Sequence, residues 1–253
     1  VAGADGLLVV DTRGTRRQGE RLRDEIRRLD PRPVHWVVNT HQHFDHTFGN
    51  VAFDDVTIYA HEAAAERVRR LCREDGDDDP LNAEVIETPL RHPDTTFSSV
   101  SVIELGDRYV ELLHPGRGHT DGDAVIRVPD ADVVFAGDLV EESAPPSFGP
   151  DCFPLEWPET LELATQVMGD GTVVVPGHGV PVDRGYVMNQ RGDVGEVATA
   201  ITGMVQAGVS VDDAIAQLPQ ADLPWDPARL HDAVRRGYAH SDPPPPRTLP
   251  LIG

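Results

Sequence analysis

Six consecutive residues, 41–46 with the sequence HQHFDH, hold three histidines and one aspartate. Neutral imidazole is the commonest protein ligand for zinc, and a carboxylate oxygen also suits a Lewis-acidic ion. If the loop is tightly curved, His41 and His43 can converge on one ion, and Asp45 and His46 then point toward a second. The alternative is a polar loop that gathers histidines by chance, but the chain has only 11 histidines in 253 residues. The segment therefore predicts a metal site.

The neighbouring segments predict the elements that would position this loop. Residues 35–40, HWVVNT, are β-branched and aromatic, which is typical of a buried strand, and residues 6–12 predict another strand. Between them, residues 15–29 carry apolar side chains at helical spacing among many charges, which predicts an amphipathic helix packed on the sheet. Its apolar stripe comprises Leu22, Ile26 and Leu29. Strand, helix and strand together form a βαβ unit, and the metal loop leaves the second strand.

Later segments continue this alternation of strands and helices. Residues 81–98 predict a loop-rich segment, which borders the pocket or only leads into the next strand. Residues 143–157 are rich in proline and predict a loop over the metal face, which supplies substrate contacts or serves as a plain connector. The remaining expected strands are 56–60, 99–104, 108–113, 124–128, 132–136 and 172–175, and the remaining expected helices are 61–73, 159–168, 193–207, 210–218 and 226–239.

Four motifs make the sequence resemble the metallo-β-lactamase superfamily. Residues 41–46 match its spacing His-x-His-x-Asp-His, and GRGHTDGD at 116–123, FAGD at 135–138 and VPGHG at 175–179 resemble its later motifs in order. The resemblance covers roughly residues 6–182. It implies an α/β fold, namely a four-layer αβ/βα sandwich, with additional C-terminal helices.

The resemblance also implies how the chain is organised. Residues 1–190 are expected to form the metallo-β-lactamase-fold domain, residues 191–240 a helical part packed on the same domain, and residues 241–253 a proline-rich tail. Members of the family usually have further β-structure before the strand that corresponds to residues 6–12, so we expect that the chain lacks N-terminal strands. A targeting signal could be missing with them, and we otherwise expect a cytoplasmic protein.

The family's ligand set can be carried onto this sequence residue by residue. The implied ligands are His41, His43 and His119 for the first ion, Asp45, His46 and His178 for the second, and Asp138 as a bridge between them. Seven ligands are too many for one tetrahedral zinc and suit two ions about 3.5–4 Å apart. Asp138 and Asp45 are the expected catalytic residues, because one bridges the ions and the other could also shuttle a proton. Asp11 resembles the first family motif, which hydrogen-bonds the metal loop, although a simple turn residue is the alternative.

This assignment predicts a dinuclear zinc-dependent hydrolase that cleaves an ester, thioester, lactone or similar carbonyl bond by metal-bound hydroxide. A bridging Asp138 favours this arrangement over a true β-lactamase, where that position usually does not bridge. The alternatives are a mononuclear iron enzyme resembling the persulfide dioxygenases, a β-lactamase, and a regulatory protein on an inactive scaffold. The sequence does not separate zinc from iron or manganese, because their ligand preferences overlap.

Composition narrows the range of partners. The net charge of −21 argues against binding to a nucleic-acid backbone, and only 40 positions separate Asp138 from His178, too few for the inserted domain of nuclease relatives. No apolar run reaches about 18 residues, so no membrane span is expected. A small-molecule substrate is the expected partner, and the oligomeric state stays open. Cys72 and Cys152 are not in a Cys-x-x-Cys pair, and they are either two reduced thiols or one disulfide.

Overall fold

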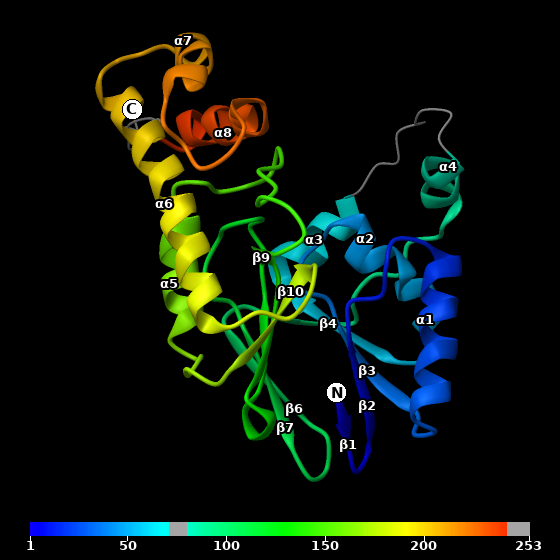
Figure 1. Ribbon diagram of the computed structural model, residues 1–253. Coiled ribbons are helices and arrows are strands. Elements are labelled where there is room, and N and C mark those ends of the chain that lie inside the picture. Colours follow the sequence, from blue (N-terminus) through cyan, green and yellow to red (C-terminus); the bar gives the residue numbers. More distant parts are fainter. Residues whose placement is uncertain (71–79, 242–253) are drawn as a thin grey trace, which may run out of the picture.

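The computed structural model describes residues 1–70 and 80–241. Two five-stranded sheets face each other, and helices cover the outer face of each sheet (Figure 1). The first sheet has the order β1-β2-β3-β4-β5, antiparallel between β1 and β2 and parallel from β2 to β5. Its strands are β1 (Ala2–Gly3), β2 (Gly6–Val10), β3 (Val34–Val38), β4 (Thr57–His61) and β5 (Thr95–Phe97).

The second sheet has the order β10-β9-β8-β7-β6, and only its β9–β10 pair is parallel. Its strands are β6 (Val100–Glu104), β7 (Tyr109–Leu113), β8 (Val125–Val128), β9 (Val133–Glu141) and β10 (Val173–His178). The predicted hairpin between β6 and β7 is confirmed, and its turn contains Gly106 with φ of +95°. A positive φ of this kind favours glycine, which has no Cβ to clash with the backbone.

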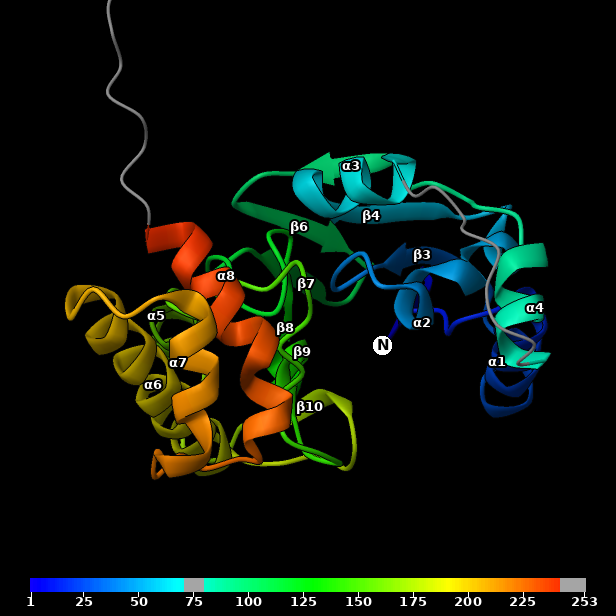
Figure 2. The same ribbon diagram turned by 90° about the horizontal axis from the view of Figure 1, so that it is seen from above.

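Helices α1 and α4 lie on the side of the first sheet, and α5 to α8 lie on the side of the second (Figure 2). The helices are α1 (Arg16–Leu29), α2 (Phe44–Thr47), α3 (Glu62–Arg70), α4 (Pro80–Glu87), α5 (Trp157–Thr165), α6 (Arg184–Gln206), α7 (Val211–Gln217) and α8 (His231–Ser241). The order of layers is therefore helix, sheet, sheet, helix. This is the four-layer α/β sandwich that the resemblance implied.

The side chains of β2 and β3 point alternately to the two faces of the first sheet, and apolar clusters cover both faces. Leu8 and Val38 pack in the cluster between the two sheets, whereas Val9 and Val37 pack in the cluster beneath α1. Successive residues of a strand point to opposite faces, so neighbouring positions supply the two clusters. A run of apolar residues in these strands is therefore required by the four-layer arrangement.

Helix α1 matches its prediction except at its last residue. Thr15 caps the helix, since its side chain accepts a hydrogen bond from the backbone N–H of Gln18. Leu22 and Ile26 pack on the cluster beneath the helix, as predicted. Leu29 is 87% exposed, so its assignment to the apolar stripe was wrong. The helix ends at Leu29, and this side chain lies beyond the apolar cluster.

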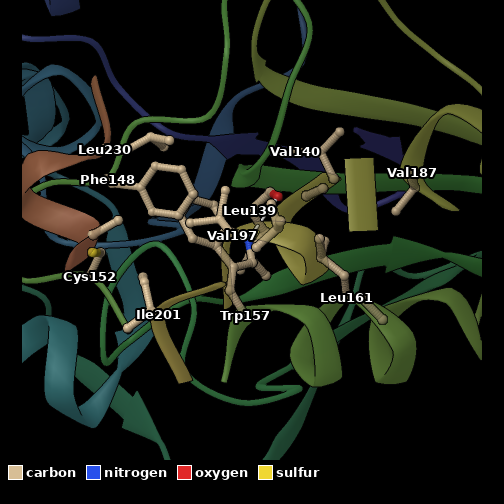
Figure 3. Packing of buried hydrophobic residues seen from close by; sticks show 14 of the residues in the cluster. Leu139, Val140, Phe148, Cys152, Trp157, Leu161, Val187, Val197, Ile201 and Leu230 are labelled. Atoms are coloured by element: carbon tan, nitrogen blue, oxygen red, sulfur yellow. Dashed lines mark hydrogen bonds between the residues drawn. The ribbon is translucent and has the colours of Figure 1, made fainter. Parts of the chain in front are cut away.

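The outer face of the second sheet packs on α5 to α8 through one large apolar cluster (Figure 3). Trp157 is fully buried in it, and its indole N–H donates a hydrogen bond to the backbone oxygen of Leu139 in β9. Leu230 and Val234 belong to the same cluster, so the C-terminal helices share the core of the second sheet. Burial of the strand that carries Asp138 against these helices fixes that strand firmly.

Two helices differ from the sequence-based expectation. Residues 80–87 form α4 where a loop was predicted, and Glu84 ties this helix to Thr15 by a hydrogen bond of 2.7 Å. Helix α6 begins at Arg184, before the predicted 193, because Asp183 caps it by accepting a hydrogen bond from the N–H of Tyr186. The helix continues without a break past residue 190. The predicted boundary between the fold domain and the C-terminal helical part at residues 190 and 191 stays a prediction.

Some expectations fall on residues outside the described ranges, namely the last turn of the helix predicted at 61–73, the tail from residue 242 and Cys72. Within the described ranges, Cys152 is a buried free thiol. In the same part of the chain, no helix has the length and apolar character that a membrane span requires.

Candidate metal centre

The predicted ligands meet at one edge of the sandwich, where the parallel strands of the first sheet end. The loop after β3 and the adjoining α2 supply four of them, the loop between β7 and β8 supplies one, and β9 and β10 supply one each. In that order they are His41, His43, Asp45 and His46, then His119, then Asp138 and His178. The carboxyl ends of the parallel strands β2, β3 and β4 lie at a common edge (Figure 1), and side chains far apart in the sequence can therefore meet there.

A first group contains His41, His43, His119 and Asp138, and one ligand atom from each lies within 4.8 Å of the others. The Nδ1 atom of His43 is 2.8 Å from the Nε2 atom of His119. The Oδ2 atom of Asp138 is 3.5 Å from Nε2 of His119 and 3.9 Å from Nε2 of His41. These four residues are the set that the resemblance implied for the first ion and the bridge.

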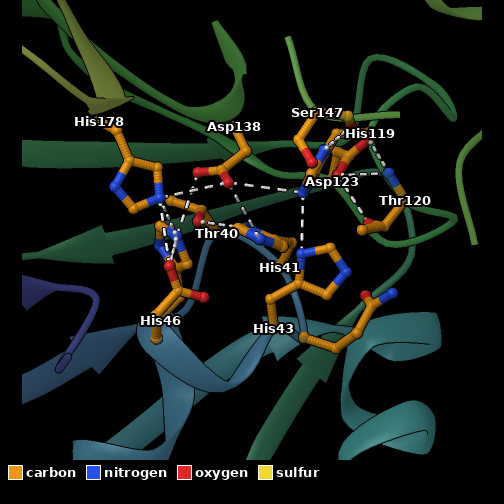
Figure 4. Close-up of polar contacts among 12 residues, drawn as sticks. Thr40, His41, His43, His46, His119, Thr120, Asp123, Asp138, Ser147 and His178 are labelled. Atoms are coloured by element: carbon orange, nitrogen blue, oxygen red, sulfur yellow. Dashed lines mark hydrogen bonds and ion pairs between the residues drawn. The ribbon is translucent and has the colours of Figure 1, made fainter. Parts of the chain in front are cut away.

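A second group contains Asp45, His46 and His178, again with ligand atoms within 4.8 Å of one another. The Nε2 atom of His178 is 3.2 Å from Oδ2 of Asp45 and 3.4 Å from Nε2 of His46. Asp138 reaches this group too, because its Oδ1 is 3.1 Å from His46 and its Oδ2 is 3.5 Å from His178. Figure 4 shows Asp138 between the two groups. All seven predicted residues are thus brought together, and their role as metal ligands stays a prediction.

Asp11 holds the metal loop in place. Its Oδ1 accepts a hydrogen bond from the backbone N–H of Thr40, and its Oδ2 accepts one from the Thr40 hydroxyl at 2.7 Å. The same Oδ2 lies 2.8 Å from Nδ1 of His46. Because the Thr40 hydroxyl donates to Asp11, it accepts from Nδ1 of His41, 3.0 Å away. Asp11 therefore orients two imidazoles at once, and the expectation that it hydrogen-bonds the metal loop is confirmed.

The loop of residues 143–157 orients the other two imidazoles. Nε2 of His43 lies 3.1 Å from Oδ2 of Asp151, which also accepts a hydrogen bond from the Gln42 side chain at 2.8 Å. Nδ1 of His119 donates to the backbone oxygen of Ser147. The loop thus lies over the metal face, as predicted. Sequence reasoning missed Asp151 itself, since nothing in the local pattern connects it to a histidine 108 positions earlier.

These contacts determine which ring nitrogens carry protons. In His41, His43, His46 and His119 the outer nitrogen faces a hydroxyl, carboxylate or carbonyl oxygen, so it carries the hydrogen. When these rings are neutral, their inner nitrogens present lone pairs to the shared space between the two groups. Buried lone pairs and carboxylates in such contact repel one another unless a cation lies among them.

Two atoms at the centre support this conclusion. Nε2 of His41 is buried without a hydrogen-bond partner among the described residues, and the buried Oδ1 of Asp138 has only the contact of 3.1 Å with Nε2 of His46. Buried polar atoms are almost always hydrogen-bonded, so unpaired atoms need an explanation. Imidazole nitrogen and carboxylate oxygen are both good ligands for a divalent metal ion. The residues present therefore fit two metal ions.

Burial keeps two of the imidazoles neutral. It lowers the pKa of His119 to about 4, and it lowers the pKa of His41 well below its usual range. Both rings are nearly inaccessible to solvent. Metal ligands must be deprotonated, so these two rings are ready to bind an ion at neutral pH without first losing a proton.

The carboxylates dominate the other side of the centre. Hydrogen bonds to Asp138 and Asp45 raise the pKa of His178 to about 10. Burial opposes a charge on His46, but the carboxylates of Asp11, Asp138 and Asp45 raise its pKa well above the usual range. This side therefore favours positive charge strongly, and a metal ion would replace the protons that these rings otherwise hold.

A cavity of about 650 Å³ opens beside the first group. His43 and Asp45 form part of its wall, Phe44 and Phe48 give it an apolar surface, and the 143–157 loop contributes another side. Phe48 is only 5% exposed, so most of its ring packs in the interior. The cavity therefore opens onto the candidate metal centre.

His61 does not join either group. Its Nδ1 accepts a hydrogen bond from the backbone N–H of Ala63 at 3.3 Å, and its Nε2 lies 3.1 Å from the backbone oxygen of Ser98. The ring also stacks on His114. His61 therefore makes its polar contacts at the start of α3, away from the candidate metal centre.

Comparisons with known proteins agree with this geometry. The sequence model described as the Metallo-beta-lactamase superfamily matches residues 1–178. The metallo-beta-lactamase type 2 of Bacillus cereus is 27% identical over 186 residues, covering 73% of this chain and 67% of that protein. The 2,4-dinitroanisole O-demethylase subunit alpha of a Nocardioides species is 28% identical over 183 residues, covering 70% and 51%. The human acyl-coenzyme A thioesterase MBLAC2 is 29% identical over 159 residues, covering 56% and 55%.

The chain thus spans about two thirds of the length of the lactamase and about half of the other two relatives. Among solved structures, a metallo-beta-lactamase from Pontibacter korlensis superposes with a TM-score of 0.63 at 25% identity, covering 76% of this chain and 85% of that one. The DIM-1 metallo-beta-lactamase has the same TM-score at 20% identity, covering 78% and 85%, and supports the fold alone. With its fold, its clustered histidine and aspartate side chains and the matching family model, the chain belongs to the metallo-beta-lactamase superfamily of metal-dependent hydrolases.

Proposed function

We propose that this protein is a dinuclear zinc-dependent hydrolase that cleaves an ester, thioester, lactone or similar carbonyl bond. One observation carries the proposal: four imidazoles have their outer nitrogens bound, so their inner nitrogens face the carboxylate of Asp138 across a shared space. Only cations can fill that space favourably. The candidate ligands form two adjoining groups, and this favours two metal ions over one.

The proposed roles follow from where each side chain lies. His41, His43 and His119 would hold the first ion, and Asp45, His46 and His178 the second, with Asp138 shared. When bound, such ions lower the pKa of a shared water toward 7 and polarise a carbonyl oxygen. The side chain of Asp45 is 34% exposed and lines the cavity, so it can also pass a proton to a leaving group.

The cavity supports a substrate with an apolar part. Phe44 and Phe48 would contact this part, while His43 and Asp45 face the reacting carbonyl. Asp151 and the rest of its loop cover the first group and limit access of bulk water to His119. Among the relatives, one is a thioesterase and another a β-lactamase, so hydrolysis of a β-lactam amide is the second candidate function.

A panel of substrates tests the proposal. Zinc-replete protein would be assayed against thioesters, lactones, aryl esters and β-lactams, together with an Asp138→Ala variant. We expect turnover of at least one carbonyl substrate and its loss in the variant, since Asp138 is shared by both groups. Activity of the variant equal to that of the unmutated protein would refute the dinuclear mechanism. Bound iron with oxygen consumption, in place of hydrolysis, would support the dioxygenase alternative.

A further inference from the structure

Glu141 is a buried carboxylate beside the candidate metal centre and is not one of the seven predicted ligands. It lies in β9, three positions after Asp138, and only 5% of the residue is exposed. One of its carboxylate oxygens forms a group with Asp138 and His178 in which the ligand atoms lie within 4.8 Å of one another. This group overlaps the second set of predicted ligands through His178.

The backbone around Glu141 is held firmly by α6. Its N–H donates to the side-chain oxygen of Gln190 at 2.9 Å, and its carbonyl accepts from the Tyr186 hydroxyl at 2.7 Å. The amide nitrogen of Gln190 also donates to the carbonyl of Leu139. These bonds fix the end of β9, so the side chain of Glu141 is presented to the centre from a rigid element.

The carboxylate itself has no such support. In the part of the chain that the structure describes, no backbone N–H, hydroxyl or guanidinium donates a hydrogen bond to it, and its polar neighbours are Asp138 and His178. A buried carboxylate normally requires a hydrogen-bond donor or a cation. Two buried carboxylates side by side raise this requirement further, because their charges repel. A shared proton or a metal ion would meet it.

We propose that Glu141 is an additional ligand of the second metal position, which it shares with Asp45, His46, His178 and the bridging Asp138. This inference rests on the dinuclear centre of the proposed function. With Glu141 included, the second position has three carboxylates and two imidazoles, whereas the first has three imidazoles and one carboxylate. Carboxylate oxygens suit harder ions such as Mn²⁺, while imidazoles suit zinc. The second position would therefore accept Mn²⁺ more readily than the first.

The test uses protein loaded with one equivalent of zinc and titrated with Mn²⁺, in which free Mn²⁺ is followed by electron paramagnetic resonance. We expect Glu141→Gln to weaken binding of the second ion at least 10-fold, since loss of even an outer-sphere partner costs about 10–100-fold. The matched control is Asp193→Asn, since Asp193 lines the same cavity of about 360 Å³ as Glu141 but belongs to neither ligand group. We expect this control to bind Mn²⁺ like the unmutated protein.

Thermal unfolding of the same variants gives an independent measurement. Without metal, Glu141→Gln should melt at or above the temperature of the unmutated protein, because one of two repelling carboxylates is gone. With both ions added, its melting temperature should rise less. Equal Mn²⁺ affinity in the Glu141→Gln variant and the unmutated protein would overturn the inference and leave the dinuclear proposal intact. Failure of the unmutated protein to bind any second ion would overturn both.

Discussion

Replacing Asp151 by asparagine should weaken the first metal position alone. Asp151 lies 3.1 Å from Nε2 of His43, and this contact turns the Nδ1 atom of His43 toward His119. Burial works against the charge of Asp151, but the hydrogen bonds from His43 and Gln42 outweigh it and lower its pKa to about 2. From an ordinary value of 3.8, that shift corresponds to about 2 kcal/mol of favourable interaction.

Metal sites in general give a free energy of similar size for a carboxylate that orients a ligand. Loss of a carboxylate that orients a ligating histidine costs about 10–100-fold in metal affinity, or about 1.4–2.7 kcal/mol. We therefore expect Asp151→Asn to reduce zinc affinity at the first position 10–100-fold and to leave the second position unchanged. Isothermal titration calorimetry with zinc would resolve the two binding events.

The matched control comes from the same loop. Glu156 forms an exposed ion pair with Arg117, and a surface pair of this kind contributes about 0–1 kcal/mol. Glu156→Gln should therefore leave both zinc affinities as they are. An Asp151→Asn protein that binds two zinc ions as tightly as this control would refute the idea that Asp151 positions His43.

Three further predictions concern stability and the metal loop. Asp11→Asn should lower zinc affinity at least 10-fold in calorimetry and destabilise the fold by about 1–3 kcal/mol in urea unfolding, because asparagine keeps one oxygen for the N–H of Thr40 but leaves the Thr40 hydroxyl and the ring of His46 without their acceptor. Trp157→Ala should cost about 3–5 kcal/mol in the same urea titration, since a fully buried indole is removed from the core, and an effect below 1 kcal/mol would contradict that packing. In metal-free protein, the lowered pKa of Asp151 stabilises the fold above about pH 4, and this stability is lost as pH falls toward 2, so Asp151→Asn should flatten the acid limb of the stability curve.

Local patterns predicted most of the fold. The central strand β2, for example, is a run of apolar residues, because the sandwich buries both faces of this sheet. Contacts made at long range were not predictable in this way. Helix α4 lacks an apolar stripe and is tied down by Glu84 through a hydrogen bond to Thr15, so no periodic signal marked it. Leu29 had the right spacing but lies past the cluster that it was expected to cover.

The candidate site was likewise predictable from the sequence only in part. Motif spacing pointed to the seven side chains that the structure brings together, because four of them lie within six consecutive residues and the others lie in or between strands of the second sheet. No local sequence pattern identified the residues that orient the predicted ligands or that are proposed to add to them. Asp151 acts on a histidine 108 positions earlier, and Glu141 resembles any other acidic residue of a strand until its burial beside Asp138 is seen. Such roles become visible only when tertiary contacts are known.

Metal content is the most direct test of the central claim that the seven clustered side chains hold two cations. Protein saturated with zinc and then dialysed against metal-free buffer would be analysed for zinc per chain, beside Asp138→Ala treated identically. We predict two zinc ions per chain for the unmutated protein and no more than one for the variant, because Asp138 lies between both groups. Two ions retained by both proteins, or none by the unmutated one, would contradict the claim.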